Sequence, residues 1–163
     1  MDENFSHSLV NYSEHELIKK IGTIKKRLKQ GNLVSGYHYD DLAYMVDELA
    51  CFDLGRFMLI NQGIDGYWTD YAINLPRDIV AKLSEMEQIL FNSRVMKATY
   101  QRQQIFKRES QKKVKNANHL AAIPSGLMSE LLDLDYSNIN NIEITAVDLD
   151  AQSLPHSQQK YPN

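Results

Sequence analysis

The segment His119-Leu120-Ala121-Ala122-Ile123-Pro124-Ser125-Gly126 is a short apolar run that ends in a proline and a glycine. A second apolar run, Ile142-Glu143-Ile144-Thr145-Ala146-Val147, is rich in β-branched residues and is followed by Asp148. The apolar residues between the two runs, at 127–134, have the spacing of a helix packed on its neighbours. Strand, tight turn, helix and strand make a βαβ unit, in which the two strands are parallel. This part of the chain therefore predicts the opening of a parallel sheet.

The residues before this unit predict helices rather than strands. Ser13 and Glu16 have the spacing of a capping box, and Gly31 is placed to end the first helix. A second helix is expected to begin at Asp40 or Asp41. The residues expected to face inward are Leu17, Ile18, Ile21, Ile24 and Leu28 in the first helix, and Leu42, Met45, Val46 and Leu49 in the second.

Three more helices are expected before the βαβ unit. Asp53 can cap a short one that ends at Gly63, and Pro76 suits the first turn of the next. The residues expected to form the buried face of that helix are Ile79, Val80, Leu83, Met86 and Leu90. The last helix covers roughly residues 93–115.

The predicted fold is therefore mainly α with a C-terminal βαβ unit. We place a helical N-terminal region at residues 1–117 and an incomplete Rossmann-like segment at residues 118–163. A complete doubly wound domain needs on the order of 150 residues. Because the whole chain has 163, it cannot hold both the helical region and a full sheet of that kind.

The composition excludes several classes of protein. The chain is 43% hydrophobic with a net charge of −3, which argues against disorder and against a whole-protein affinity for nucleic acid. A single cysteine, Cys51, cannot form an intramolecular disulfide, and no run approaches the ~18 apolar residues of a membrane span. The five histidines share no metal-ligand spacing, and the acidic N-terminus is unlike a secretory signal. We therefore expect a cytoplasmic protein with no metal site.

Gly126 and Asp148 are the first candidates for a ligand site. In parallel α/β folds, ligands bind outside the carboxyl ends of the strands, where a turn glycine lets backbone N–H groups approach. An acid at the end of the second strand can accept hydrogen bonds from both ribose hydroxyls. The two residues are 22 positions apart, close to the ~20 of a nucleoside site. The alternative, which spacing leaves open, is a structural turn glycine and a surface aspartate.

Three stretches form a recognisable combination: Leu120-Ala121-Ala122-Ile123-Pro124-Ser125-Gly126-Leu127-Met128, Leu131-Leu132-Asp133-Leu134-Asp135-Tyr136 and Ala146-Val147-Asp148-Leu149-Asp150. Together they resemble a group of bacterial class I S-adenosylmethionine-dependent methyltransferases, in which a proline–cysteine–glycine turn follows the first strand and an acidic pair closes the second. Residues 47–49, 54–57 and 61–71 are similar to the helical extension of that group. Two positions depart from the pattern: Ser125 replaces the usual cysteine, and Ala122 stands where the common pattern has an acid.

The resemblance implies a role for each candidate residue. Ser125 and Gly126 would line the methionine side of S-adenosylmethionine, Asp148 would hold the ribose, and Asp150 would lie near the adenine edge. The segment from Gly63 to Tyr71, whose glycines predict a loop, would cover the cofactor with Tyr67 and Trp68. The alternative for this aromatic segment is an ordinary core anchor.

The resemblance also implies that the later strands of the family, which position the methyl acceptor, are absent. We therefore expect a truncated Rossmann-like methyltransferase, whose cofactor site is complete only with further sequence or a partner. A two-stranded remnant is expected to leave an exposed edge and an uncovered apolar face. Whether the chain is itself an enzyme stays open, and its methyl acceptor is unknown.

A second function is predicted by the charge pattern. Between Arg94 and Lys115, eight basic residues stand against one acid, Glu109, with Tyr100 and Phe106 among them. Such a segment can bind nucleic acid or an acidic partner, or it can be the solvated face of a long helix. The first helix, with six basic residues, is a second candidate. The alternative to a methyltransferase is thus a helical interaction module with basic faces.

Overall fold

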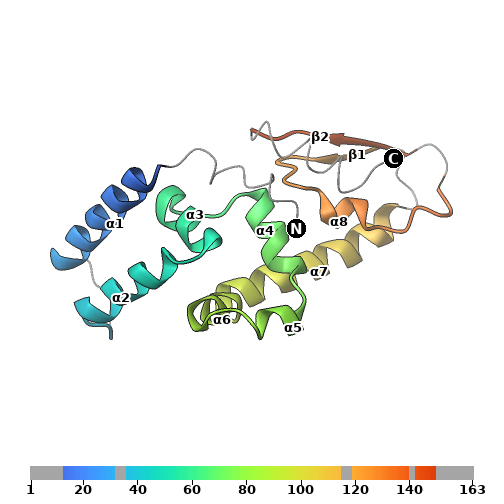
Figure 1. Cartoon of the computed structure of the whole chain (residues 1–163). Helices are drawn as coiled ribbons and strands as arrows, with labels where there is room; N and C mark the ends of the chain where they lie inside the picture. The colour runs from blue at the N-terminus through green and yellow to red at the C-terminus, as the bar shows by residue number, and fades with distance from the viewer. Residues whose placement is uncertain (1–12, 32–35, 115–118, 140–141, 150–163) are drawn as a thin grey trace. The chain divides into compact units, whose positions relative to one another are not determined.

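The computed structural model describes residues 13–31, 36–114, 119–139 and 142–149, and within these ranges the chain is mainly helical with one parallel two-stranded sheet (Figure 1). The elements are α1 (Glu14–Lys29), α2 (Tyr39–Leu49), α3 (Asp53–Asn61), α4 (Gly66–Asn74), α5 (Arg77–Val80), α6 (Glu85–Phe91), α7 (Arg94–Val114), β1 (His119–Ala122), α8 (Ser129–Leu132) and β2 (Glu143–Ala146). The predicted fold class, mainly α with a C-terminal βαβ unit, is confirmed.

The chain forms two compact units that alternate along the sequence. The first comprises residues 1–64 and 77–90, and the second comprises residues 65–76 and 91–163. Each unit therefore contains two separate segments of the chain. The boundary predicted between residues 117 and 118 lies outside the described residues.

In the first unit, α1, α2 and α3 pack against one another around Leu17, Val46 and Leu59. The predicted capping box begins α1: the Ser13 N–H donates to the Glu16 carboxylate (2.9 Å), and the Glu16 N–H donates to the Ser13 hydroxyl (3.3 Å). One residue of the predicted stripe is wrong, because Ile18 is 60% exposed. It lies one position past Leu17, on the edge of the helix that faces solvent.

The single helix expected after Pro76 is two helices, α5 and α6. Ser84 forms a capping box with Glu87, because its N–H donates to that carboxylate (3.1 Å) and its hydroxyl accepts from the Glu87 N–H (3.4 Å). This local N-terminal signal begins a new helix at Glu85 and interrupts the apolar stripe. Val80 and Met86 are buried as expected, but Ile79 is exposed.

Alanine at two helical glycines of the first unit, Gly22 and Gly55, is expected to change the stability in opposite directions. A Cβ atom on Gly55 would overlap the carbonyl oxygen of Leu49, whereas one on Gly22 would meet nothing within 4 Å. We expect Gly55→Ala to lower the free energy of unfolding by about 1–3 kcal/mol, and Gly22→Ala to raise it by about 0.5–1 kcal/mol. Urea denaturation of both variants checks this, and equal changes would contradict the close packing of α3 on Leu49.

The sheet belongs to the second unit. β1 and β2 are parallel, with His119 opposite Glu143 and Ala122 opposite Ala146, as the βαβ prediction requires. One face of the sheet packs on the core formed by Val114, Leu131 and Leu134, and Leu120 and Ile144 lie against it. His119 and Thr145 lie on the other face, where the histidine Nε2 is 2.8 Å from the threonine hydroxyl. The face expected to be uncovered and apolar is therefore polar at these positions.

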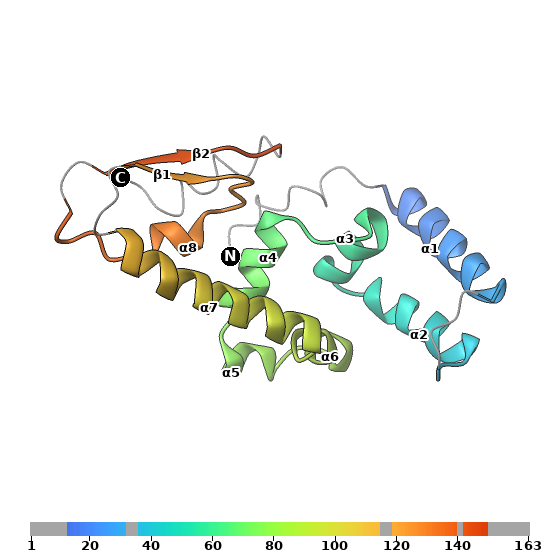
Figure 2. The same cartoon turned by 180° about the vertical axis from the view of Figure 1, so that it is seen from behind.

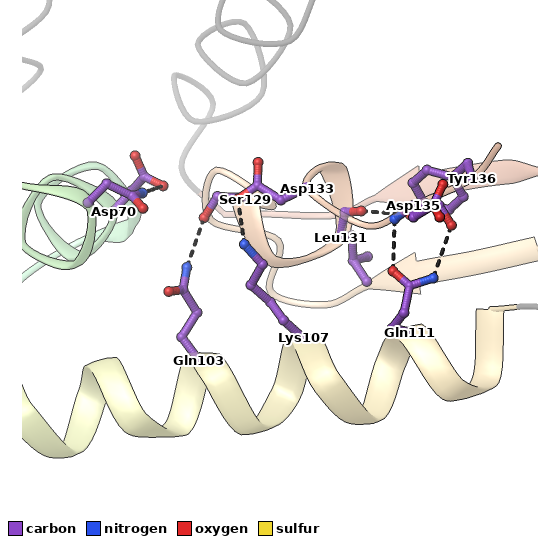
Figure 3. Close-up of polar contacts among 10 residues, drawn as sticks. Asp70, Gln103, Lys107, Gln111, Ser129, Leu131, Asp133, Asp135 and Tyr136 are labelled. Carbon is purple, nitrogen blue, oxygen red and sulfur yellow. Dashed lines mark hydrogen bonds and ion pairs between the residues drawn. The ribbon is translucent and has the colours of Figure 1, made fainter.

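α7 lies beside α8 in the same unit and is joined to the α8 segment by three polar side chains at helical spacing (Figures 2 and 3). Gln103 donates to the Ser129 hydroxyl (3.3 Å), and Lys107 pairs with Asp133 (2.7 Å). Gln111 exchanges two hydrogen bonds with the backbone of Asp135 (3.0 and 2.8 Å). These contacts fix the βαβ segment to the long helix that precedes it.

The helix expected over residues 127–134 is only the single turn α8. Met128 has a left-handed backbone (φ 56°), so the helix cannot extend toward Gly126. Leu127, Met128, Leu131 and Leu134 are nevertheless buried. Leu132, expected to pack with them, is only half-buried. The apolar pattern therefore predicted most of the buried residues but overestimated the length of the helix.

Candidate functional site

The candidate site is the turn after β1, together with the end of β2. The Val147 N–H donates to the Ala122 carbonyl (3.0 Å), and the Ser125 N–H donates to the Val147 carbonyl (2.9 Å). The Ile123–Pro124 peptide in this turn is cis. The turn is therefore hydrogen-bonded to the residue that directly follows β2, at the carboxyl ends of both strands.

Gly126 and Asp148, predicted as a pair from their spacing, contact each other directly. The Gly126 N–H donates to a carboxylate oxygen of Asp148 at 2.7 Å, a short bond typical of a charged acceptor. Gly126 has φ +50°, in the region that favours glycine. The structure thus brings a backbone donor and a carboxylate together at the edge where ligands bind in parallel sheets.

Ser125 lies beside this pair. The side chain is buried, and its hydroxyl is 3.3 Å from the Gly126 carbonyl oxygen and 3.5 Å from the Asp148 carboxylate. The serine hydroxyl therefore faces the Gly126–Asp148 pair. Asp150, the fourth predicted residue of this group, lies outside the described residues.

Exposed apolar side chains surround the carboxyl ends of the strands. Ile123 directly follows β1, Val147 directly follows β2, and Leu149 comes just after Asp148. All three are exposed, Leu149 completely. Ligand sites combine such apolar surface with a few polar groups that fix orientation.

The aromatic segment predicted as a covering loop is instead the helix α4. The Asp65 carboxylate accepts from the Trp68 N–H (2.9 Å) and caps it, which is why the helix begins at Gly66. Trp68 is 5% exposed, and its ring meets those of Tyr67 and Tyr71 edge to face at 5.1 and 5.4 Å. These contacts agree with the core-anchor alternative for Trp68, while Tyr67 is half-buried.

Gly66 is a residue of this site that the sequence analysis missed. A Cβ atom at Gly66 would lie 2.7 Å from Gly126 Cα, so the first residue of α4 contacts the backbone of the candidate turn. A glycine just inside a helix, directly after its capping aspartate, is the available sequence signal. Glycine is an unfavourable helix residue, so its presence there indicates close backbone approach.

The basic helix predicted over 93–115 is α7, and Lys115 lies outside the described residues. Lys107 points to Asp133, whereas the exposed basic residues are Arg94, Lys97, Arg102, Arg108, Lys112 and Lys113. Hydrogen bonds from Lys112 and Arg108 hold the pKa of the Glu109 carboxyl below its usual value. Val95 (73% exposed) and Phe106 (50% exposed) add apolar surface to the helix.

The other candidate basic helix, α1, directs two of its cations to α2. Lys25 pairs with Asp47 at 2.6 Å, and Lys29 lies 5.2 Å from the centre of the Tyr39 ring. These contacts reduce the positive charge that α1 offers to a partner. Cations of α7 are paired as well, but α7 carries seven basic residues against one acid, whereas α1 carries six against two, so α7 is the stronger candidate for anion binding.

No protein-family model matches the sequence, and no curated protein matches it. The chain is similar to the crystal structure of a possible exported protein from Bordetella parapertussis, with a TM-score of 0.81 and 25% sequence identity. The match covers 96% of this chain and 52% of that chain, so this chain spans about half the length of its structural neighbour. The two proteins share a fold over nearly all of this chain.

None of the helices in the described ranges is both long and apolar enough to cross a membrane. In the same ranges, no group of three histidine, cysteine, aspartate or glutamate residues has the geometry to hold a metal ion.

Proposed function

We propose that this chain is the cofactor-binding part of an S-adenosylmethionine-dependent methyltransferase, either active itself or an inactive N-terminal fragment of one. The observation that most supports the proposal is the 2.7 Å hydrogen bond between the Gly126 N–H and the Asp148 carboxylate, at the carboxyl ends of two parallel strands. The spacing of Gly126 and Asp148 and the family resemblance both indicate a site at this turn. In such folds, ligands bind at the carboxyl edge of the sheet, where the turn glycine and the acid both lie.

The residues present fit the cofactor chemically. Asp148 accepts from the Gly126 N–H and lies 3.5 Å from the Ser125 hydroxyl, and because a carboxylate accepts several hydrogen bonds, it would also accept from the ribose hydroxyls. Ile123, Val147 and Leu149 would supply apolar contact to the adenine ring. S-adenosylmethionine would supply the methyl group, and the protein's part is to align it with the acceptor and exclude water.

Titration calorimetry with S-adenosylhomocysteine tests the proposal. We expect the chain to bind it with a dissociation constant of roughly 0.1 mM or tighter, which a ligand of nucleoside size reaches at about 0.3 kcal/mol per heavy atom. The same titration is made on the chain fused to the part of the Bordetella parapertussis protein that lies outside the match. In a separate assay with S-adenosylmethionine and candidate acceptors, release of S-adenosylhomocysteine by a chain that binds the ligand indicates an active enzyme, and binding without release indicates an inactive fragment. Absence of binding in both forms contradicts the proposal.

A second candidate function is favoured by the exposed cations of α7. These residues would bind nucleic acid or an acidic partner by charge complementarity, and the exposed Phe106 would stack on a base or pack on a protein surface. Both proposed functions include the cytoplasmic location expected from the sequence. In that reducing compartment, the exposed Cys51 would remain a thiol.

The α7 proposal predicts a charge-dependent affinity. We expect weaker binding of a single-stranded oligonucleotide when three cations are replaced by glutamine, at Arg94, Arg102 and Lys113. The slope of log K against log salt concentration should fall by about 2, because each lost phosphate contact lowers it by ~0.7. Glu109→Gln should tighten binding, because this change removes the acid that Lys112 and Arg108 contact. The same measurement with polyglutamate in place of the oligonucleotide tests whether α7 binds an acidic protein partner.

The control for this experiment is a matched triple variant in α1, Lys19→Gln, Lys26→Gln and Arg27→Gln, which removes the same charge from another exposed helix. Fluorescence anisotropy at two salt concentrations measures all variants. Equal loss in both triples would show that only net charge matters and would contradict a specific α7 surface.

A further inference from the structure

The backbone of α4 meets the backbone of the candidate turn at two glycines. A Cβ atom on Gly66 would lie 2.7 Å from Gly126 Cα, 3.3 Å from its carbonyl carbon and 3.5 Å from the Leu127 nitrogen. All three neighbours are backbone atoms, which cannot move aside as the end of a flexible side chain can. Glycine is therefore required at position 66 for this approach.

The two sides of the contact are each held by their own surroundings. Behind Gly66, the helix is capped by Asp65 and anchored by the buried Trp68. Behind Gly126, the turn is held by the Ser125 N–H on the Val147 carbonyl and by the Met128 N–H on the Ser125 carbonyl. With the turn held in this way, the Gly126 N–H reaches the Asp148 carboxylate at 2.7 Å.

We infer that Gly66 is a positioning residue of the cofactor site: the first turn of α4 supports Gly126 and holds its N–H on Asp148. Its relevance to S-adenosylmethionine rests on the proposed function. The contact between Gly66 and Gly126 itself supports the hydrogen bond to Asp148 without a ligand. It gives the aromatic segment, which forms α4, a part in cofactor binding that differs from a covering loop. α4 supports the turn from behind with its backbone, while Trp68 keeps α4 in place.

A ligand-free measurement tests the positioning role directly. Hydrogen exchange of the Gly126 amide is expected to be slow in the wild-type chain and about tenfold faster in Asp148→Ala, which removes the acceptor. Gly66→Ala should accelerate the exchange as much as Asp148→Ala does, and the double variant no further, because both changes break one bond. Gly63→Ala is the matched control, since a Cβ atom at Gly63 meets nothing within 4 Å.

Unchanged Gly126 exchange in a folded Gly66→Ala variant would overturn the inference. If that variant does not fold, the wild-type chain decides the question. The contact requires a nuclear Overhauser effect between the Hα protons of Gly66 and Gly126, and its absence would overturn the inference equally.

The same variants, titrated with S-adenosylhomocysteine, separate this inference from the proposed function. Weaker binding by about tenfold in Gly66→Ala, with wild-type affinity in Gly63→Ala, supports both. Wild-type affinity in Gly66→Ala overturns the positioning role and leaves the cofactor site intact. If the wild-type chain does not bind the ligand, the proposed function fails in this form, while the exchange measurement still decides the role of Gly66.

Discussion

Replacing Asp148 with alanine is expected to weaken binding of S-adenosylhomocysteine by about 10- to 150-fold. The side chain accepts a hydrogen bond from the Gly126 N–H at 2.7 Å and, in the proposed complex, would accept others from the ribose. A hydrogen bond to a charged group contributes about 1.5–3 kcal/mol, which corresponds to that range of dissociation constants. Titration calorimetry of the variant and the wild-type chain measures the effect.

Glu143→Gln is the control for this variant. Glu143 is an exposed acid on the same strand, β2, but at the amino end, away from the turn. We expect it to leave the affinity unchanged. If both variants bind like the wild type, Asp148 is a surface aspartate and the turn glycine is structural. If the two variants weaken binding equally, the effect comes from the loss of one negative charge and not from a contact with the ribose.

Trp68→Ala is expected to cost the second unit about 3–5 kcal/mol of folding free energy, the usual range for removal of a large buried aromatic side chain. The loss is large because Trp68 is 5% exposed and makes edge-to-face contacts with two tyrosines. Such a change is comparable with the whole stability of a small unit. Urea denaturation followed by circular dichroism measures it, since the variant has no tryptophan.

Tyr100→Ala gives the comparison, because Tyr100 is 42% exposed on α7 in the same unit. Its removal should change the free energy of unfolding by less than about 1 kcal/mol. A Trp68→Ala variant that is as stable as the wild type but binds S-adenosylhomocysteine weakly would restore the covering-loop hypothesis. The burial of Trp68 predicts the opposite result.

Local signals predicted much of the fold. The capping box of Ser13 and Glu16 and the two apolar runs at 119–123 and 142–147 depend on residues close in sequence, and both predictions are confirmed. The pairing of Gly126 with Asp148 was also predictable, because parallel strands bring their carboxyl ends to one edge. These features need no knowledge of distant contacts.

The errors arose where two signals competed. The apolar stripe from Ile79 to Leu90 suggested one helix, yet the capping box at Ser84 begins a second one there. The leucines at 127–134 have helical spacing, but the left-handed Met128 limits α8 to one turn. In both places backbone hydrogen bonding at a helix end outweighed side-chain periodicity.

The contact of Gly66 with Gly126 could not be predicted in the same way. The two glycines are 60 positions apart, and only the packing of the second unit brings them together. Asp65 and Gly66 indicate a helix start and a close approach, but nothing in the residues says what is approached. Long-range backbone contacts of this kind leave a weak local signal.

The most direct test of the central claim is a ¹H–¹⁵N NMR titration of the chain with S-adenosylhomocysteine. The account predicts saturable shifts of the Ser125, Gly126 and Asp148 amides, with competition by adenosine and none by methionine alone. The Glu143 amide at the other end of β2 should not move. Unchanged Gly126 and Asp148 resonances at millimolar ligand, in the chain and in its fusion, would contradict a nucleoside site at this turn.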